Sequence, residues 1–563
     1  MKRDISALSG AVFDVCVVGG GITGVCVAHD AASRGLKVAL LERGDFSEGT
    51  SSASTKLVHG GTRYLEHAEF GLVREALRER RLLLKLAPHL TQPLPFMIPL
   101  YRKGPVAPTL IRTGMLMYDM LSYDKNRDAL SDKLFPWHRY ISPEEAVSLE
   151  PELEAKDLLG ASVYTDGQMP NPMRLALEFA KTAAGNGAQL ANYARVTGLQ
   201  IEGNKVVGVE ALDRLTGQSF HVTAAVTVNC AGIWATEVMK LLNLPLPVQL
   251  KPSKGIHVVT RPISKSHAVV SVSPTGRRVM IIPWRGKSLI GTTDDFYEGD
   301  IDRIRATTAE IQILLDEVNA FVPSARLTIA DVEASYAGAR PLVSRPGKSA
   351  SDLSRKYQIL DHGKVSGRPG LLSVLGGKYT TSRAMAEDIV DQVCKKTGKG
   401  GPCMTEQLPI GGGDIGVVQE YLERQKPAAK DLVDEACLAE LVRSYGSGHV
   451  EVLDYVRKDP RLGQRIAPDR PFILAQVRHA AEHEMATSVA DVALRRTDAG
   501  NMGDKNLEVG KAIAAELAQV LNLSAADVEK QLAAYKDQLA IDPAPAPAPA
   551  AATPAAAPAT GGG

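Results

Sequence analysis

The sequence predicts an α/β protein of more than one domain, and three observations carry this prediction. The apolar run Val15 to Val18 stops at three glycines, which is typical of a strand buried on both faces of a parallel sheet. A helical pattern then leads to a second short apolar run, Val38 to Leu41, so that strand, helix and strand follow one another. The chain has 563 residues, which is more than a single hydrophobic core organises.

The glycines after the first strand indicate a bound nucleotide. Gly19, Gly21 and Gly24 stand in G-x-G-x-x-G spacing, which permits a tight turn, lets the backbone approach a pyrophosphate and packs the helix against the strand. The predicted helix Ile22 to Arg34 directs its N-terminus at the anion. Glu42 follows the second strand, where a carboxylate accepts hydrogen bonds from both hydroxyls of an adenosine ribose and disfavours a 2′-phosphate. This pattern predicts a Rossmann-like dinucleotide site, which NAD and FAD would both fit.

Later motifs resemble a known flavoprotein family. The stretch from Gly49 to Glu66, GTSSASTKLVHGGTRYLE, resembles the flavin-side loop of the FAD-dependent glycerol-3-phosphate dehydrogenases and favours FAD over NAD. Further matches follow in the family's order at 229–234, 282–284, 290–294, 335–341 and 375–383. The resemblance implies an FAD-binding domain of the glutathione-reductase/D-amino-acid-oxidase type, a β-rich substrate domain and a C-terminal helical domain.

The pattern along the chain predicts four parts. We expect a discontinuous FAD-binding domain at 11–90, 150–250 and 351–400, and a substrate domain at 91–149 and 251–350. Within the FAD-binding domain, Gln189 to Val196 is expected to form one strand. Helix formers at i, i+3, i+4 spacing predict a helical domain at 410–540. Residues 541–563 alternate Pro and Ala without large apolar side chains, and this predicts a disordered tail.

The resemblance places cofactor contacts on the glycine turn and on several later loops. In the family's pattern the backbone of Val196 meets the adenine, and His59 lies beside the flavin ring. Gly376 and Gly377 precede a helix beginning near Thr380, whose N-terminus would stabilise negative charge on the flavin pyrimidine. The expected cofactor-binding set is Gly19, Gly20, Gly21, Ile22, Thr23, Gly24, Glu42, Arg43, Thr50, Ser51, Ser52, Lys56, Leu57, His59, Gly60, Val196, Ala231, Gly232, Trp234, Gly376, Gly377 and Thr380.

The expected substrate site consists of cations. Oxidising a secondary alcohol requires removal of the hydroxyl proton, and a phosphorylated substrate requires cations that hold its dianion. The resemblance implies substrate-binding roles for Arg63, Tyr64, Arg355 and Lys378, because guanidinium groups can hold phosphate oxygens in bidentate fashion. Arg340 would lie beside the reacting carbon. Since a guanidinium stays protonated, we assign Arg340 to alkoxide stabilisation and substrate orientation.

The identity of the catalytic base stays open at this point. His257 is the expected proton acceptor, because an imidazole titrates near neutral pH. A lone histidine at a strand start is more often structural, and only the resemblance makes the two interpretations equal. His59 could instead orient the flavin ring.

The expected reaction is oxidation of sn-glycerol 3-phosphate to dihydroxyacetone phosphate by hydride transfer to FAD, with ubiquinone or menaquinone as the next acceptor. A glycerol-3-phosphate oxidase would reoxidise the same flavin with oxygen. An alternative from another class is a non-catalytic flavin-bound sensor, but the cations Arg63, Arg355 and Lys378 argue against it. Amine oxidation is less compatible with the phosphate-side loops.

Composition excludes several functions. The net charge of +1 offers no basic field for nucleic acid. The six cysteines, at 16, 26, 230, 394, 403 and 437, form no C-x-x-C pair and indicate reduced thiols in a cytoplasmic protein. The chain contains no run of about 20 apolar residues, so we expect no transmembrane helix.

Membrane contact rests on one segment and on the family. Leu94 to Leu121 is apolar but interrupted by Arg102, Lys103 and Arg112, which suits an interfacial helix on anionic lipid and equally a core helix. The family's respiratory members imply peripheral association with the cytoplasmic face of the inner membrane. A homodimer is compatible with the sequence, which does not fix the oligomeric state.

One competing motif lies near the C-terminus. His479, Glu482 and His483 stand in the H-x-x-E-H order of an inverted zinc-peptidase signature. A zinc site needs a third protein ligand, and no neighbouring segment supplies one. The stretch runs on to Thr497 and resembles the family's C-terminal helix, so we expect no metal site.

Overall fold

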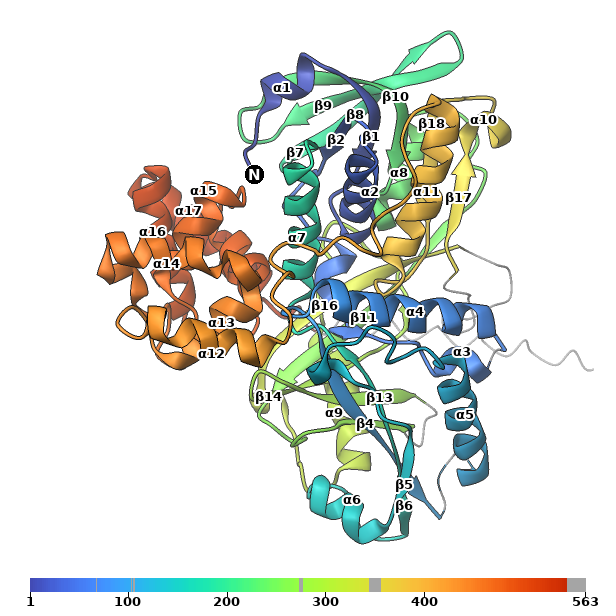
Figure 1. The fold of residues 1–563 in the computed structure, drawn as a ribbon, viewed down its shortest axis with the longest axis vertical. Coiled ribbons are helices and arrows are strands. Elements are labelled where there is room, and N and C mark those ends of the chain that lie inside the picture. Colours follow the sequence, from blue (N-terminus) through green and yellow to red (C-terminus); the bar gives the residue numbers. More distant parts are fainter. Residues whose placement is uncertain (67, 103, 105–106, 273–276, 344–355, 544–563) are drawn as a thin grey trace, which may run out of the picture.

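The computed structural model describes residues 1–66, 68–102, 104, 107–272, 277–343 and 356–543. Arg355, Lys103 and the predicted tail beyond residue 543 lie outside the described residues. Figure 1 shows two sheets, one above the other, with a helical unit at their side.

The upper sheet has the strand order β17-β18-β10-β1-β2-β7, and the hairpin of β8 and β9 extends from β10. Its strands are β1 (Val12–Val18), β2 (Val38–Leu41), β7 (Gln189–Ala191), β8 (Ala194–Glu202), β9 (Lys205–Asp213), β10 (Ser219–Asn229), β17 (Gln358–Asp361) and β18 (Leu371–Leu375). β1 pairs in parallel with both β2 and β10, and its residues from Phe13 to Val18 are buried. Three helices cover one face of this sheet: α2 (Ile22–Ser33), α7 (Pro172–Gly185) and α11 (Ser382–Thr397).

The predicted strand Gln189–Val196 is wrong in one respect, because two strands occupy this segment. β7 ends at Ala191 and β8 begins at Ala194. Between them, the buried Asn192 amide donates hydrogen bonds to Asp45 Oδ1 (3.1 Å) and to the Met485 carbonyl (2.9 Å). Tyr193 adopts a left-handed backbone with φ 54°. This tertiary anchoring turns the chain out of the parallel sheet.

The lower sheet has the order β15-β11-β14-β13-β12-β4-β6-β3, with β16 on β11 and β5 on β6. Its strands are β3 (Leu57–Val58), β4 (Gln92–Tyr101), β5 (Arg139–Ile141), β6 (Leu158–Gln168), β11 (Leu250–Thr260), β12 (Ala268–Val272), β13 (Arg278–Trp284), β14 (Lys287–Gly291), β15 (Asp295–Phe296) and β16 (Val332–Val343). Further helices connect and cover the two sheets: α1 (Ile5–Ser9), α3 (Arg63–Glu66), α4 (Phe70–Leu86), α5 (Pro108–Leu121), α6 (Pro143–Leu149), α8 (Ala235–Lys240), α9 (Thr308–Phe321) and α10 (His362–Val365).

Two predictions about the lower sheet need correction. The expected FAD-binding block 150–250 contains β6, but β6 pairs with β4 along nearly its whole length and therefore belongs to the lower sheet. The segment Leu94 to Leu121 is not one helix. Its first part belongs to strand β4, which forms an antiparallel ladder of backbone hydrogen bonds with β6. Only its second part forms the helix α5.

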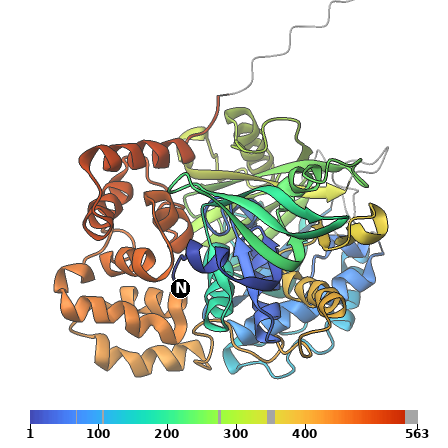
Figure 2. The same cartoon turned by 90° about the horizontal axis from the view of Figure 1, so that it is seen from above.

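The C-terminal helical domain is confirmed. It consists of α12 (Val418–Ala429), α13 (Glu435–Tyr445), α14 (His449–Lys458), α15 (Leu474–His483), α16 (Glu508–Leu521) and α17 (Ala525–Gln538), with a π-helical turn at Asp491–Arg496. Figures 1 and 2 show it beside both sheets, next to α7. No helix among the described residues is long and apolar enough to cross a membrane.

Candidate active site

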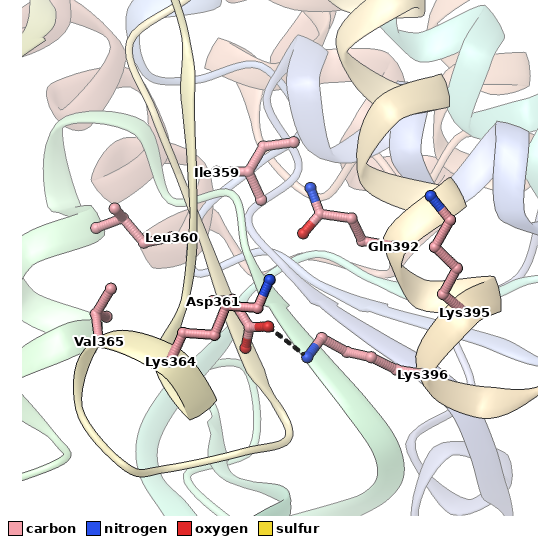
Figure 3. Close-up of a pocket in the computed structure, with 8 residues that line it drawn as sticks. All are labelled: Ile359, Leu360, Asp361, Lys364, Val365, Gln392, Lys395 and Lys396. Carbon is pink, nitrogen blue, oxygen red and sulfur yellow. Dashed lines mark hydrogen bonds and ion pairs between the residues drawn. The ribbon is translucent and has the colours of Figure 1, made fainter.

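A groove of about 540 Å³ lies on the surface between β17, α10 and the C-terminal end of α11 (Figure 3). Its rim carries Lys364, Lys395 and Lys396, and the last of these pairs with Asp361 at 2.7 Å. None of the predicted site residues lines this groove. Those residues meet instead around the loops that follow the strands of the two sheets.

The glycine turn after β1 has no room for side chains. Gly19 has φ 109°, and a Cβ there would lie 2.7 Å from the Cys230 carbonyl oxygen. A Cβ on Gly24 would lie 1.8 Å from the Gly19 carbonyl oxygen. The turn therefore brings its backbone close to α2 and to the loop after β10, as a dinucleotide cradle requires.

Glu42 closes this cradle from the end of β2. Its carboxylate accepts hydrogen bonds from the Gly20 N–H (2.6 Å) and the Gly44 N–H (2.8 Å). Burial raises the pKa of Glu42 to about 7, although these two N–H groups oppose the shift. The carboxyl group is thus poised to titrate near neutral pH.

The flavin-side loop is held against both sheets. The Ser51 hydroxyl accepts a hydrogen bond from the Ile22 N–H (2.9 Å) at the start of α2, and the Thr50 hydroxyl donates to the Ala339 carbonyl (2.7 Å) on β16. Ser52 caps its own turn through the Gly49 carbonyl. The loop therefore lies between the cradle and the lower sheet.

Arg43 and Trp234 form a joint contact on the other side of the cradle. The Arg43 guanidinium lies 4.0 Å from the centre of a Trp234 ring, and both side chains donate to Asp302 Oδ1, at 2.7 and 2.6 Å. The role of Asp302 could not be predicted from the sequence, because this residue lies in an irregular segment without a motif.

Two of the predicted arginines meet at one carboxylate. Arg63 NH1 lies 3.5 Å from Asp294 Oδ2, and Arg340 NH1 lies 3.2 Å from Asp294 Oδ1. Arg340 comes from β16 and Arg63 from α3, so they are distant in sequence. Asp294 ends the quoted motif 290–294, but its role as a bridge between the arginines could not be read from spacing.

Lys378, after β18 of the upper sheet, lies beside Tyr64, which follows Arg63 in the sequence. Gly376 and Gly377, with φ 74° and 99°, turn the chain after β18, and the Lys378 Nζ then lies 4.0 Å from the centre of the Tyr64 ring. Among the described residues, this buried ammonium has no hydrogen-bond partner. Burial lowers its pKa to about 8, while Glu75 and Glu69 oppose the shift.

His257 lies in the middle of β11 and faces the flavin-side loop. Its ring stacks on Tyr336 of β16 with centroids 5.0 Å apart, and its Nε2 lies 3.1 Å from the Thr55 hydroxyl. Burial, with Arg340 and Lys56 adding to it, lowers the pKa of His257 to about 3. The imidazole is therefore neutral at physiological pH.

The backbones of His59 and Gly60 are held by two side chains that are distant in the sequence. The His59 N–H donates to the Thr380 hydroxyl (3.2 Å), and the Gly60 N–H donates to the hydroxyl of Tyr118 on α5 (3.0 Å). Tyr118 in turn donates to Asp166 at 2.5 Å. Burial lowers the pKa of His59, and Asp166 opposes this shift. No motif in the sequence points to Tyr118 or Asp166.

The Lys56 side chain lies against an aromatic ring and the C-terminal domain. Its buried ammonium lies 4.7 Å from the centre of the Trp284 ring and 3.7 Å from Asp498 of the C-terminal domain. Its N–H donates to the Ser54 hydroxyl (3.2 Å) and its carbonyl accepts from the Met169 N–H. Both its side chain and its backbone are thus engaged within the protein.

Most of the remaining predicted cofactor residues occupy the same region of the upper sheet and its loops. Val196 on β8 and Ala231 after β10 pack against the cluster that contains Leu41 of β2. Gly232 starts the short turn that ends at Trp234. Gly20 and Gly21 lie on the glycine turn, Thr23 lies in the first turn of α2, and Leu57 begins β3 of the lower sheet.

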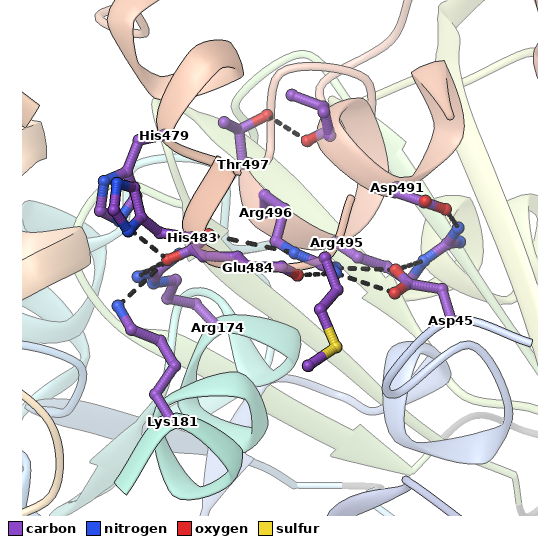
Figure 4. Close-up of polar contacts among 12 residues, drawn as sticks. Asp45, Arg174, Lys181, His479, His483, Glu484, Asp491, Arg495, Arg496 and Thr497 are labelled. Atoms are coloured by element: carbon purple, nitrogen blue, oxygen red, sulfur yellow. Dashed lines mark hydrogen bonds and ion pairs between the residues drawn. The ribbon is translucent and has the colours of Figure 1, made fainter. Parts of the chain in front are cut away.

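The H-x-x-E-H motif lies at the border between the helical domain and α7 (Figure 4). The rings of His479 and His483 stack with centroids 5.0 Å apart, and His479 Nε2 lies 3.4 Å from Glu484 Oε1. Glu482 accepts a hydrogen bond from the Tyr455 hydroxyl (2.5 Å). The part of the chain that the structure describes contains no group of His, Cys, Asp and Glu arranged to hold a metal ion.

Buried ion pairs fasten the helical domain to the upper sheet. Arg174 of α7 pairs with Glu484 at 2.6 Å, and both are excluded from solvent (Figure 4). Asp45, three residues after Glu42, pairs with Arg495 and Arg496, each at 2.7 Å. Burial alone would raise the pKa of Asp45, but the two arginines outweigh it and lower the pKa to about 2.

Family comparisons cover most of the chain. Residues 14–391 match the FAD dependent oxidoreductase family, and residues 403–528 match the C-terminal domain of alpha-glycerophosphate oxidase. The chain is 39% identical to a glycerol-3-phosphate dehydrogenase of Synechocystis sp. over 509 residues, which cover 88% of this chain and 90% of that protein. It is 36% identical to glycerol-3-phosphate dehydrogenase 2 of Mycobacterium tuberculosis over 527 residues, which cover 93% of this chain and 87% of that protein.

Solved structures agree with these relatives. The glycerol-3-phosphate dehydrogenase from Bacillus halodurans, complexed with FAD, aligns with a TM-score of 0.77 and 29% identity, covering 95% of this chain and 96% of that chain. The L-alpha-glycerophosphate oxidase from Mycoplasma pneumoniae aligns with a TM-score of 0.51 and 20% identity, over 70% of this chain and 98% of that chain, which shows a shared fold alone. The predicted fold class and the predicted FAD cofactor are confirmed, and the chain belongs to the family of FAD-dependent glycerol-3-phosphate dehydrogenases.

Proposed function

We propose that this protein oxidises sn-glycerol 3-phosphate to dihydroxyacetone phosphate. The observation that carries the proposal is the buried Lys378 ammonium, which has no hydrogen-bond partner among the described residues and lies beside Tyr64, next in sequence to Arg63. A buried cation of this kind is costly unless an anion meets it, and a phosphate dianion supplies that partner. The names of the relatives support the same substrate.

The cations have separate roles in this proposal. Lys378 and Arg63 hold the phosphate, and Arg340 holds the oxygen on the carbon that is oxidised. Asp294 balances part of the arginines' charge before substrate arrives and keeps both side chains in place. Bound FAD supplies the acceptor for the hydride that leaves the substrate carbon.

His257 is proposed as the proton acceptor. In the tautomer whose Nε2–H donates to Thr55, the Nδ1 lone pair is available, and Nδ1 has no hydrogen-bond partner among the described residues. Its low pKa keeps the ring neutral and ready to accept a proton. Arg340 lowers the cost of the alkoxide, so the weak basicity of His257 suffices.

The cradle fits the cofactor that the family requires. Crowding at Gly19 and Gly24 brings bare backbone to the pyrophosphate position, and the half-buried Glu42 carboxylate can accept hydrogen bonds from the ribose hydroxyls. We propose that the Gly376-Gly377 turn and Thr380 hold the flavin pyrimidine from the start of α11, and that Val196 holds the adenine.

Anaerobic mixing of the FAD-loaded protein with glycerol 3-phosphate tests the function. We expect rapid bleaching of the flavin absorbance, and no bleaching with glycerol at the same concentration. A yellow flavin that stays oxidised with glycerol 3-phosphate would contradict the substrate and would favour the sensor alternative.

We further propose a quinone as the electron acceptor, of ubiquinone or menaquinone type. The support is the aerobic dehydrogenase named among the relatives, which is 32% identical over 97% of this chain. Reoxidation of the bleached flavin by a soluble quinone analogue should be much faster than reoxidation by oxygen. Faster recovery with oxygen would identify an oxidase.

Replacing Lys378 with methionine should weaken substrate binding about 10-fold to 100-fold, because a charged hydrogen bond to the phosphate is lost. In the wild type, affinity should fall as the pH rises through about 8, since Lys378 then loses its proton. The variant should lack this fall. The substrate Kd is measured from the perturbation of the flavin spectrum.

Two matched variants control this experiment. Lys378→Arg keeps the charge and should keep most of the affinity, whereas Lys395→Met removes an exposed lysine from the distant groove and should change nothing. Wild-type affinity in Lys378→Met would exclude Lys378 from the phosphate site.

Glu42 should make cofactor binding depend on pH. Ribose hydroxyls stabilise the ionised carboxylate, so FAD affinity should be highest above pH 7 and should fall by up to about tenfold per pH unit below it. The FAD Kd of the apoprotein, measured by flavin fluorescence quenching, provides the test. Glu42→Gln should give a weaker and pH-independent Kd, and a flat wild-type profile would contradict the role.

We propose that α5 attaches the protein to the inner-membrane surface on its cytoplasmic side. Leu110, Leu116 and Met120 on this helix are 62%, 52% and 64% exposed. Apolar side chains next to arginines suit an interfacial helix on anionic lipid. Arg112 lies on the same helix, 4.0 Å from the centre of the Tyr140 ring.

Vesicle co-sedimentation tests this attachment. The double variant Leu116→Glu and Met120→Glu should lose most binding to vesicles that contain anionic lipid. Ile313→Glu places a charge on α9, at a side chain that is 48% exposed, and should leave binding unchanged. Equal vesicle binding by the wild type, the double variant and Ile313→Glu would exclude α5 as the membrane-binding helix.

A further inference from the structure

We propose that Asp498 of the C-terminal domain is a positioning residue for the catalytic histidine, and that it acts through Lys56. This inference rests on the proposed role of His257. It concerns a contact between the helical domain and the flavin-side loop, outside the cradle and the phosphate site.

The three residues before Leu57 contact His257 or its stacking partner Tyr336. The Ser54 carbonyl accepts a hydrogen bond from the Tyr336 hydroxyl (2.9 Å), and the Thr55 hydroxyl meets His257 Nε2 (3.1 Å). Tyr336 also stacks on the His257 ring. The orientation of the imidazole is therefore set by Thr55 and Tyr336 together.

Lys56 fixes the same segment from its other side. Its backbone is in the left-handed region with φ 58°, and its ammonium lies 5.6 Å from the centre of the Tyr336 ring and 4.7 Å from the centre of the Trp284 ring. The side chain is almost fully excluded from solvent. A buried ammonium in this position needs a carboxylate, since aromatic faces alone compensate little of the lost hydration.

Asp498 is that carboxylate, and the helical domain supplies it. Its Oδ1 lies 3.7 Å from Lys56 Nζ and accepts a hydrogen bond from Asn501, while its Oδ2 accepts one from Arg285 (2.9 Å). Arg285 also pairs with Glu440 of α13 at 2.7 Å. Burial lowers the pKa of Lys56, Asp498 opposes this shift, and Arg285 adds to it. The charge on Lys56 thus depends on one residue of the C-terminal domain.

The test compares Lys56→Met, Asp498→Asn and the double variant. Each single variant should slow anaerobic flavin reduction at saturating substrate about tenfold, with substrate Kd and FAD Kd changed by less than about threefold. If Asp498 acts through Lys56, the flavin of the double variant should be reduced no more slowly than the flavin of Lys56→Met. Thr55→Val, which removes the hydroxyl next to His257, should reproduce the loss.

Hydrogen exchange provides a readout that needs no substrate. Amides of the segment 54–60 should exchange faster in both single variants than in the wild type. Glu516→Gln is the control, because Glu516 is equally buried and pairs with Arg478 and Arg461, but within the helical domain. It should leave both exchange in 54–60 and flavin reduction unchanged.

The outcomes separate the inference from the proposed function. The inference would be overturned if the single variants bind FAD and their flavin is reduced at the wild-type rate. It would also be overturned if the losses in reduction rate of the two single variants add in the double variant. If Asp498→Asn does not fold, Lys56→Met decides, since Asp498 then keeps Arg285 as its partner. A wild type that glycerol 3-phosphate does not bleach would refute the proposed function, and unchanged exchange in 54–60 would still refute the inference separately.

Discussion

The carboxylate of Asp294 is the constraint on which the candidate active site depends. Two guanidinium groups from distant segments converge on it, Arg63 from α3 and Arg340 from β16. Without a carboxylate between them, two like charges in a partly buried site would repel each other and turn towards solvent. Lys378 lies over the Tyr64 ring, and among the described residues its ammonium has no hydrogen-bond partner. The ammonium is therefore available to a dianionic substrate.

The helical domain takes part in this arrangement through buried charges. Asp45 with its two arginines, and Arg174 with Glu484, join it to the upper sheet close to Glu42 and along α7. Removing one partner of a buried pair leaves a charge without compensation and costs about 3–5 kcal/mol, whereas the intact pair adds little net stability. These pairs therefore specify how the domain sits beside the cofactor cradle more than they stabilise the fold.

Much of the cofactor region could be predicted from sequence, because its determinants are local. The strand before Gly19, the helix after it and the strand before Glu42 follow from short apolar runs and glycine spacing, and the structure places them as expected. The lower sheet could not be assigned correctly in the same way. β6 belongs to it because β4 pairs with β6, and such pairing over some 60 residues leaves no local pattern.

The contacts that complete the site were missed for the same reason. Asp294, Asp302, Tyr118 and Asp498 each act on a residue that is far away in the sequence, and none stands in a motif that names its partner. Lys56 was identified by its motif as cofactor-binding. Its contact with Asp498, which joins the flavin-side loop to the helical domain, could not be read from that motif.

The most direct test of the account compares the second-order rate constants of flavin reduction by glycerol 3-phosphate and by glycerol. The two alcohols differ only in the phosphate that Lys378 and Arg63 are proposed to recognise. The account predicts a preference for the phosphorylated alcohol of at least about a thousandfold, which corresponds to about 4 kcal/mol of transition-state stabilisation by the phosphate. Rate constants within tenfold of each other would show that these cations do not select the substrate.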